Sequence, residues 1–153
     1  MKFLSLVLLV LIFFSFGSSQ SGDLLTHSEA LQALTDADIT ISSTGNCSDR
    51  NNRNCTSLEQ IRQSTILGLI LFKQSSSCQI NVTGGTEVGH AKGTFSHSTG
   101  WKIDISLNTC VNDYITTNLQ HIDDRADGSP QYQNIQDIYA LEKNPPHWDI
   151  LYK

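Results

Sequence analysis

Apolar and polar residues follow different periods along this chain, and each period predicts a type of secondary structure. Leucines and alanines at helical spacing predict a helix over residues 23–34, and alternation around two isoleucines predicts a short strand over residues 38–42. Thr56-Ser57-Leu58-Glu59 matches a capping box, the pattern that satisfies free amides at a helix start. We therefore expect a helix over residues 56–73, and its dense apolar positions indicate that it is the central buried helix.

The second half of the chain alternates in the manner of strands. Residues 79–83 are strand-like, and residues 101–107 place Ile103 and Ile105 on one face of a strand and Asp104 on the other. The apolar face is expected to join the core. The opposite face leaves a carboxylate free for chemistry.

The last third of the chain predicts a hairpin. A short helix is expected over residues 110–119 and a polar loop over residues 123–133. Residues 138–142 and 147–152 are strand-like and flank Lys143-Asn144-Pro145-Pro146, whose prolines cannot continue a ladder of hydrogen bonds. The whole pattern predicts one α+β domain, in which a small antiparallel sheet is backed by the central helix.

The first 19 residues have the order of a secretory signal peptide. Lys2 supplies a positive charge, an apolar run follows from Phe3 to Phe14, and small residues lead to Ser19. The run is shorter than the roughly 20 apolar residues that a membrane span needs. We therefore expect a signal peptide over residues 1–19 and a secreted, extracellular domain over residues 20–153, with no membrane attachment after cleavage.

Four cysteines lie beyond that segment, and an exported protein meets an oxidising environment, so two disulfides are expected. Three pairings are possible. We favour Cys47 with Cys55, which closes a polar loop, and Cys78 with Cys110. A four-cysteine metal site is the rival interpretation, but the spacings contain no Cys-x-x-Cys pair.

The formal net charge of −5 becomes −6 when Lys2 is removed, and no run of lysine and arginine suggests a nucleic-acid or anionic-membrane surface. We expect a monomer. Sequons begin at Asn46, Asn54 and Asn81, so glycosylation is possible on a eukaryotic secretory route.

The residues best suited to chemistry cluster between His90 and Asp104. A turn at Gly100 would fold His97 back beside the strand that carries Asp104, and imidazole with carboxylate suits zinc. A catalytic zinc needs three protein ligands and one open position. We expect His147 as the third ligand, with His90 as a second-choice ligand or a substrate contact.

These positions resemble the M15 zinc peptidases, whose signature Ser-x-His-x-x-Gly-x-Ala-x-Asp precedes a later Glu-x-x-His. His97, Gly100 and Asp104 match its spacing, and His147 is followed by an aromatic residue as in several members. The resemblance covers residues 78–153. It implies a Zn²⁺ cofactor and hydrolysis of peptide bonds in bacterial peptidoglycan stem peptides, by a carboxypeptidase or an endopeptidase. The zinc-bearing domain of Hedgehog proteins looks like a relative, although a fold can persist without the activity.

The catalytic base of that family departs from its usual place. Glu142 lies five residues before His147 where the family has three, yet a four-residue turn would make the two cross-strand neighbours. Asp149 is the alternative base, since it points to the same face as His147. Thr86 and Glu87 are candidate substrate contacts.

Other details of the substrate site also depart from the family. Ser96 directly precedes His97, Lys102 stands where the family has alanine, and the family's upstream arginine, which binds a substrate carboxylate, is absent from residues 84–96. Lys92 or Arg62 could take its place. Two other functions stay open: a zinc-stabilised binding module without activity, and a metal-free recognition domain held by its disulfides.

Overall fold

The computed structural model describes residues 24–153, so the expected signal peptide lies outside the described residues. The described chain forms three α-helices, one 3-10 helix and nine strands. In chain order they are β1 (Leu24–Leu25), α1 (His27–Asp36), β2 (Ile39–Ile41), β3 (Ile61–Arg62), α2 (Gln63–Ser76), β4 (Ile80–Gly84), η1 (His97–Thr99), β5 (Lys102–Ile105), α3 (Thr109–Asn118), β6 (Gln120–Ile122), β7 (Gln131–Asn134), β8 (Asp137–Lys143) and β9 (Pro146–Leu151).

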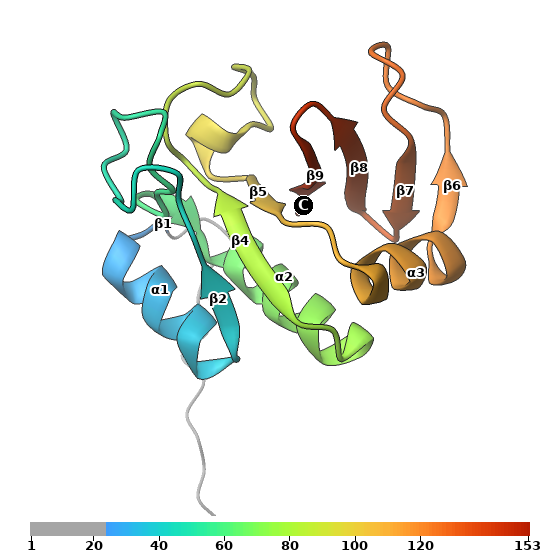
Figure 1. Ribbon diagram of the computed structural model, residues 1–153, viewed down its shortest axis with the longest axis horizontal. Coiled ribbons are helices and arrows are strands. Elements are labelled where there is room, and N and C mark those ends of the chain that lie inside the picture. The colour runs from blue at the N-terminus through green and yellow to red at the C-terminus, as the bar shows by residue number, and fades with distance from the viewer. Residues whose placement is uncertain (1–23) are drawn as a thin grey trace, which may run out of the picture.

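Seven strands form one sheet in the order β2-β4-β5-β9-β8-β7-β6, which Figure 1 shows running across the molecule from left to right. Only β2 and β4 pair in parallel, and the other neighbours are antiparallel. Strand β9 lies in the middle, between β5 and β8, although it is the last in sequence. The short strands β1 and β3 form a separate antiparallel pair.

The two faces of the sheet have different roles because successive side chains of a strand point to opposite sides. Ile103 of β5 and Trp148 of β9 join one buried core, to which all three helices contribute. The helical members of that core include Leu34 of α1, Leu69 of α2 and Ile115 of α3. The opposite face of β5 and β9 carries Lys102, Asp104, His147 and Asp149, so the sheet presents its polar face away from the core.

The predicted fold class is confirmed, and so are both disulfides, Cys47–Cys55 and Cys78–Cys110. Disulfides are typical of oxidising compartments. Among residues 24–153, no helix has the length and apolar character needed to cross a bilayer.

The predicted hairpin is also confirmed. Strands β8 and β9 pair, and the register places Glu142 opposite His147. The turn is shorter than the four residues expected, because Lys143 pairs with Pro146 and only Asn144 and Pro145 lie between the strands. Strand β4, strand β5 and helix α3 lie within two residues of their expected positions.

The expected start of the central helix was wrong. Helix α2 begins at Gln63 rather than Thr56, and the capping box of this region is absent. The Thr56 hydroxyl instead donates to the backbone oxygens of Ser42 and Thr83, at 2.8 and 3.0 Å. The side chain thus ties a turn to the edge of the sheet. A tertiary contact has outweighed a local helix signal.

Helix α1, which precedes α2 in the chain, begins with a true capping box. Thr26 accepts a hydrogen bond from the backbone N–H of Glu29, and the Glu29 side chain accepts one from the Thr26 backbone N–H. The helix therefore begins at His27, and the two leucines before it form β1. Strands β1, β3, β6 and β7 were not predicted, since each is short or lies in a polar segment.

Candidate metal centre

A left-handed turn brings His97 to the polar face of β5. Gly100 ends the 3-10 helix η1 with φ 78°, a conformation that favours glycine, and its carbonyl accepts hydrogen bonds from Arg62 and Thr65. The chain then enters β5, where Asp104 points to the same side. The Nε2 atom of His97 lies 3.2 Å from Oδ1 of Asp104, as the spacing around Gly100 led us to expect.

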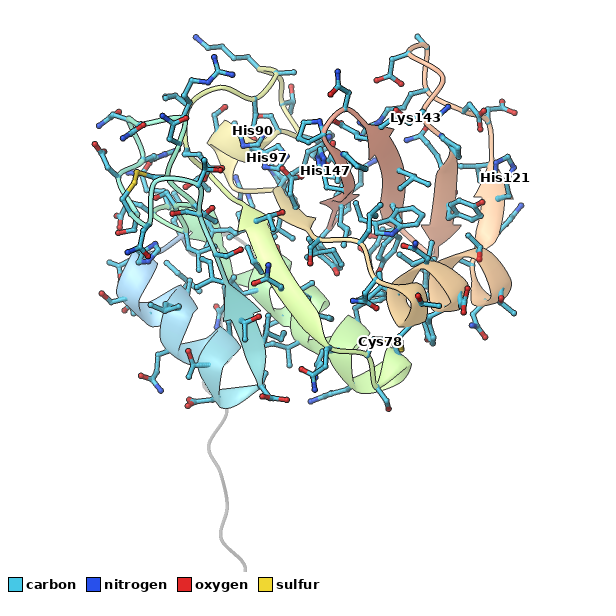
Figure 2. All side chains as sticks on the ribbon, viewed as in Figure 1. Cys78, His90, His97, His121, Lys143 and His147 are labelled. Carbon is cyan, nitrogen blue, oxygen red and sulfur yellow. A yellow bond between two sulfur atoms is a disulfide. The ribbon has the colours of Figure 1, made fainter. Side chains whose placement is uncertain are left out.

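The hairpin brings His147 to the same carboxylate from the neighbouring strand. Its Nε2 atom lies 3.6 Å from Oδ1 of Asp104 and 3.6 Å from Oε2 of Glu142. Figure 2 shows His97 and His147 gathered at one end of the sheet with His90, whereas His121 lies away from them. Residues far apart in sequence therefore converge on Asp104.

The two histidines are oriented in the same way. The Nδ1 atom of His97 donates to the carbonyl of Gly85, and Nδ1 of His147 donates to the carbonyl of Pro145, both at 2.7 Å. Each histidine thus keeps Nε2 free to face Asp104. Metal-binding histidines commonly have such a partner on the other nitrogen.

The carboxylate between them forms ion pairs with the histidines. Oδ1 of Asp104 is buried, its polar neighbours are Nε2 of His97 and Nε2 of His147, and neither contact has the geometry of a good hydrogen bond, which most buried polar atoms have. Neighbouring ligands of a tetrahedral zinc lie about 3.3 Å apart, given bonds of about 2.0–2.1 Å. The distances of 3.2 and 3.6 Å from the two histidines to this oxygen fit that spacing. The residues present therefore fit a metal ion.

His90 is also part of this cluster. Its ring stacks on that of His97, with centroids 3.8 Å apart and an interplanar angle of 18°. One ligand atom from each of His90, His97 and Asp104 lies within 4.8 Å of the others, so among the described residues these three form the possible metal-binding group; it contains the second-choice ligand His90, and His147, the expected third ligand, is not a member.

Glu87 and Thr86 lie beneath His90 and are buried. Oε1 of Glu87 lies 3.0 Å from Nε2 of His90, and the carboxylate accepts hydrogen bonds from the backbone N–H groups of Ser57 and Gly85. Burial alone would raise the pKa of Glu87, but these hydrogen bonds lower it below its usual value. Thr86 is 1% exposed, and its hydroxyl donates to backbone carbonyls. Thr86 therefore offers no surface to a substrate, while Glu87 orients His90.

Asp149 is surrounded by three basic side chains, His97, Lys102 and Arg125. Its Oδ2 accepts hydrogen bonds from Lys102 and Arg125, both at 2.7 Å, while its buried Oδ1 accepts none and lies 3.6 Å from Nε2 of His97. Burial alone would raise the pKa of Asp149, but His97 and Lys102 hold it well below its usual range. Burial likewise works against protonation of His97, yet Asp104 and Asp149 raise its pKa to about 10 in the metal-free protein. The two carboxylates attract a cation to this point.

The two candidate bases differ in access. Asp149 is 3% exposed and paired with two cations. The Glu142 side chain is one-third exposed; its Oε1 is paired with Arg125 at 2.6 Å, and its Oε2 lies 3.6 Å from Nε2 of His147. Its Oε2 faces the metal cluster. Of these two carboxylates, Glu142 is therefore the more accessible from solvent.

An open cavity of about 900 Å³ lies over the cluster, lined by the three histidines and by Lys92, Lys102 and Arg125. Sequence reasoning missed Arg125, which lies in a polar loop without a recognisable pattern. Arg62, one candidate for a substrate anchor, lies elsewhere: its guanidinium stacks 4.2 Å from the ring centroid of Trp101. Lys92 lines the cavity.

No protein-family model, curated protein or solved structure matches this chain.

Proposed function

We propose that this chain is a secreted zinc-dependent peptidase that hydrolyses peptide bonds of bacterial peptidoglycan stem peptides. One observation carries the proposal. Two histidines with fixed Nδ1 atoms direct Nε2 at the same buried oxygen, Oδ1 of Asp104, at 3.2 and 3.6 Å, beside an open cavity. Zinc would be held by His97, Asp104 and His147. The resemblance of these positions to the M15 peptidases supplies the reaction.

A bound zinc ion would acidify water and polarise a carbonyl group. Glu142 is the chain's own contribution to proton transfer. Its Oε2, which lies 3.6 Å from Nε2 of His147, takes a proton from the attacking water and gives it to the leaving amine nitrogen as the C–N bond breaks. One water molecule is consumed for each bond cleaved. Arg125 and Lys102 keep Asp149 ionised beside His97.

One observation favours the second candidate, a zinc-stabilised binding module without activity. Arg125 donates to Oε1 of Glu142 and to Oδ2 of Asp149, so one oxygen of the carboxylate that would act as the base is already engaged. The peptidase and the binding module would both hold zinc, and only the peptidase would hydrolyse a peptide bond.

Metal analysis and one substitution test both parts of the proposal. The purified protein should contain one zinc ion per chain and release new amino termini from purified bacterial walls. Glu142→Gln should keep the zinc and lose about 10²–10⁴-fold in rate, the usual contribution of a general base. Asp113→Asn, an exposed carboxylate on α3, is the matched control and should keep both.

Three results would contradict the proposal in different places. A protein without stoichiometric zinc would end both metal-based candidates and leave the disulfide-held recognition domain. Zinc without any cleavage by the unmodified protein would favour the binding module. Full activity of Glu142→Gln together with loss of activity in Asp149→Asn would move the base to Asp149.

A further inference from the structure

A carboxylate with no catalytic task anchors the segment before η1. Glu87 is 4% exposed, and its two oxygens accept hydrogen bonds from Ser57 at 2.7 Å and from Gly85 at 3.1 Å. The hydrogen bonds fix this side chain from two directions. The remaining contact of Oε1 is with Nε2 of His90. Glu87 is therefore a rigid acceptor that determines how the His90 ring is turned.

The orientation of His90 follows from that acceptor. A carboxylate accepts, so Nε2 of His90 carries the hydrogen and Nδ1 is left as the free nitrogen. Nδ1 points into the cluster and lies 3.8 Å from Oδ2 of Asp104. That separation is too long for a hydrogen bond, and it is measured to Oδ2, whereas His97 and His147 face Oδ1. With one ligand atom taken from each of His90, His97 and Asp104, the three atoms lie within 4.8 Å of one another.

We propose that His90 is a fourth protein ligand of the metal, presented by Glu87, and that the metal-loaded protein rests with a closed coordination shell. The set is then the compact group of His90, His97 and Asp104, with His147, whose Nε2 lies 3.6 Å from Oδ1 of Asp104, as the remaining member. The Glu87–His90 pair has the carboxylate–histidine–metal arrangement that typically orients a ligand histidine. The inference rests on the metal site of the proposed function and not on its peptidase activity.

His90 is also the ligand best placed to leave. Its side chain is 25% exposed, against 5% for His97 and 16% for His147. His97 belongs to η1 and His147 to β9, whereas His90 lies in a segment without helix or strand. A catalytic zinc needs an open position and a structural zinc has none. Substrate would therefore have to displace His90 before hydrolysis.

Cobalt substitution tests the ligand count directly, because the visible spectrum of protein-bound Co²⁺ depends on its ligands. The unmodified protein loaded with Co²⁺ should give a four-coordinate spectrum that thiocyanate leaves unchanged. His90→Ala should bind Co²⁺ roughly tenfold or more weakly, and thiocyanate should now shift its spectrum. His121→Ala, a histidine whose side chain is 58% exposed on β6, is the matched control and should behave as the unmodified protein.

Glu87→Gln gives a second reading that keeps the His90 side chain in place. It should weaken Co²⁺ binding by about tenfold, because the ligand loses its charged partner. Circular dichroism of each variant confirms that it is folded. Unchanged affinity in both His90→Ala and Glu87→Gln would overturn the inference, and so would a thiocyanate shift in the unmodified protein.

The outcomes separate this inference from the proposed function. A four-coordinate Co²⁺ spectrum that thiocyanate leaves unchanged, in a protein that cleaves no wall peptide, supports His90 as a ligand and refutes the peptidase. A Co²⁺ spectrum that thiocyanate shifts, in an unmodified protein that cleaves wall peptides, refutes His90 as a ligand and supports the peptidase. A protein that binds no Co²⁺ refutes both.

Discussion

Gly84 touches the carboxylate on which the metal site depends. It pairs with Asp104 across β4 and β5, and a Cβ atom added at residue 84 would lie 3.1 Å from both Cβ and Cγ of Asp104 and closer still to its Oδ2. Carbon atoms pack comfortably at about 3.5–4.0 Å, so Gly84→Ala must push Asp104 back by about 0.5–1 Å. Metal–ligand distances tolerate only about 0.2 Å.

Two effects of Gly84→Ala can therefore be separated. Overpacking should cost about 1–3 kcal/mol of unfolding free energy in the metal-free protein, measured by urea denaturation. Displacement of Asp104 should in addition weaken zinc binding at least tenfold, or about 1.4 kcal/mol, measured by competition with a chelating dye. The stability loss alone would follow from any crowded glycine. The loss of affinity is specific to a ligand.

Gly93→Ala is the control, since an added Cβ there has nothing within 4 Å. It should change stability by no more than about 0.5 kcal/mol and leave zinc affinity as it is. The reasoning is refuted if Gly84→Ala binds zinc as tightly as the unmodified protein. Asp104 would then not be a ligand in the position that the structure gives it.

Two further predictions concern stability. Cys78–Cys110 and Cys47–Cys55 span sequence separations of 32 and 8, so replacing each pair by alanine should cost roughly 3.7 and 2.5 kcal/mol in urea denaturation; equal costs would contradict the loop-entropy account. Burial lowers the pKa of His27 below its usual 6.5, and the charge of Glu59 offsets only part of this effect. The Nδ1 atom of His27 accepts a hydrogen bond from the Leu58 N–H. The folded state then takes up a proton less readily than the unfolded state. The contribution of His27 to the free energy of unfolding is therefore present above about pH 6.5 and is lost as the pH falls. The urea midpoint of the His27→Gln variant should accordingly fall less between pH 7.5 and 5 than that of the unmodified protein. An unchanged pH dependence in that variant would show that His27 is not responsible.

Local patterns were sufficient for the parts of the fold that local physics controls. The hairpin of β8 and β9 follows from two alternating runs on either side of a proline-containing turn, and this pattern predicts Glu142 opposite His147, the register that the structure has. Gly100 likewise indicated the turn beside Asp104. Both depend on residues close in sequence.

The remainder depends on partners distant in sequence. Arg125 binds Glu142 and Asp149, from 17 and 24 residues away, and nothing in its polar loop indicates those partners. Thr56-Ser57-Leu58-Glu59 carries a genuine helix-start pattern, yet Ser57 gives its N–H to Glu87, 30 residues later. A sequence pattern cannot weigh a cap against a contact that forms only in the folded chain.

Because β9 lies in the middle of the sheet, a cation bound at this site would link the two halves of the sheet. Among the described strands, β9 alone is hydrogen-bonded to both β5 and β8, so it joins the half of the sheet built from β2, β4 and β5 to the half built from β8, β7 and β6. His147 of β9 faces Asp104 of β5 across that seam. A metal ion between them would link β5 to β9. On loss of the metal ion, we expect the pairing of β5 with β9 to weaken before the strands within either half separate. At a free metal concentration of 1,000 times the dissociation constant, a metal ion that binds only the folded protein would add about 4.1 kcal/mol to the free energy of unfolding.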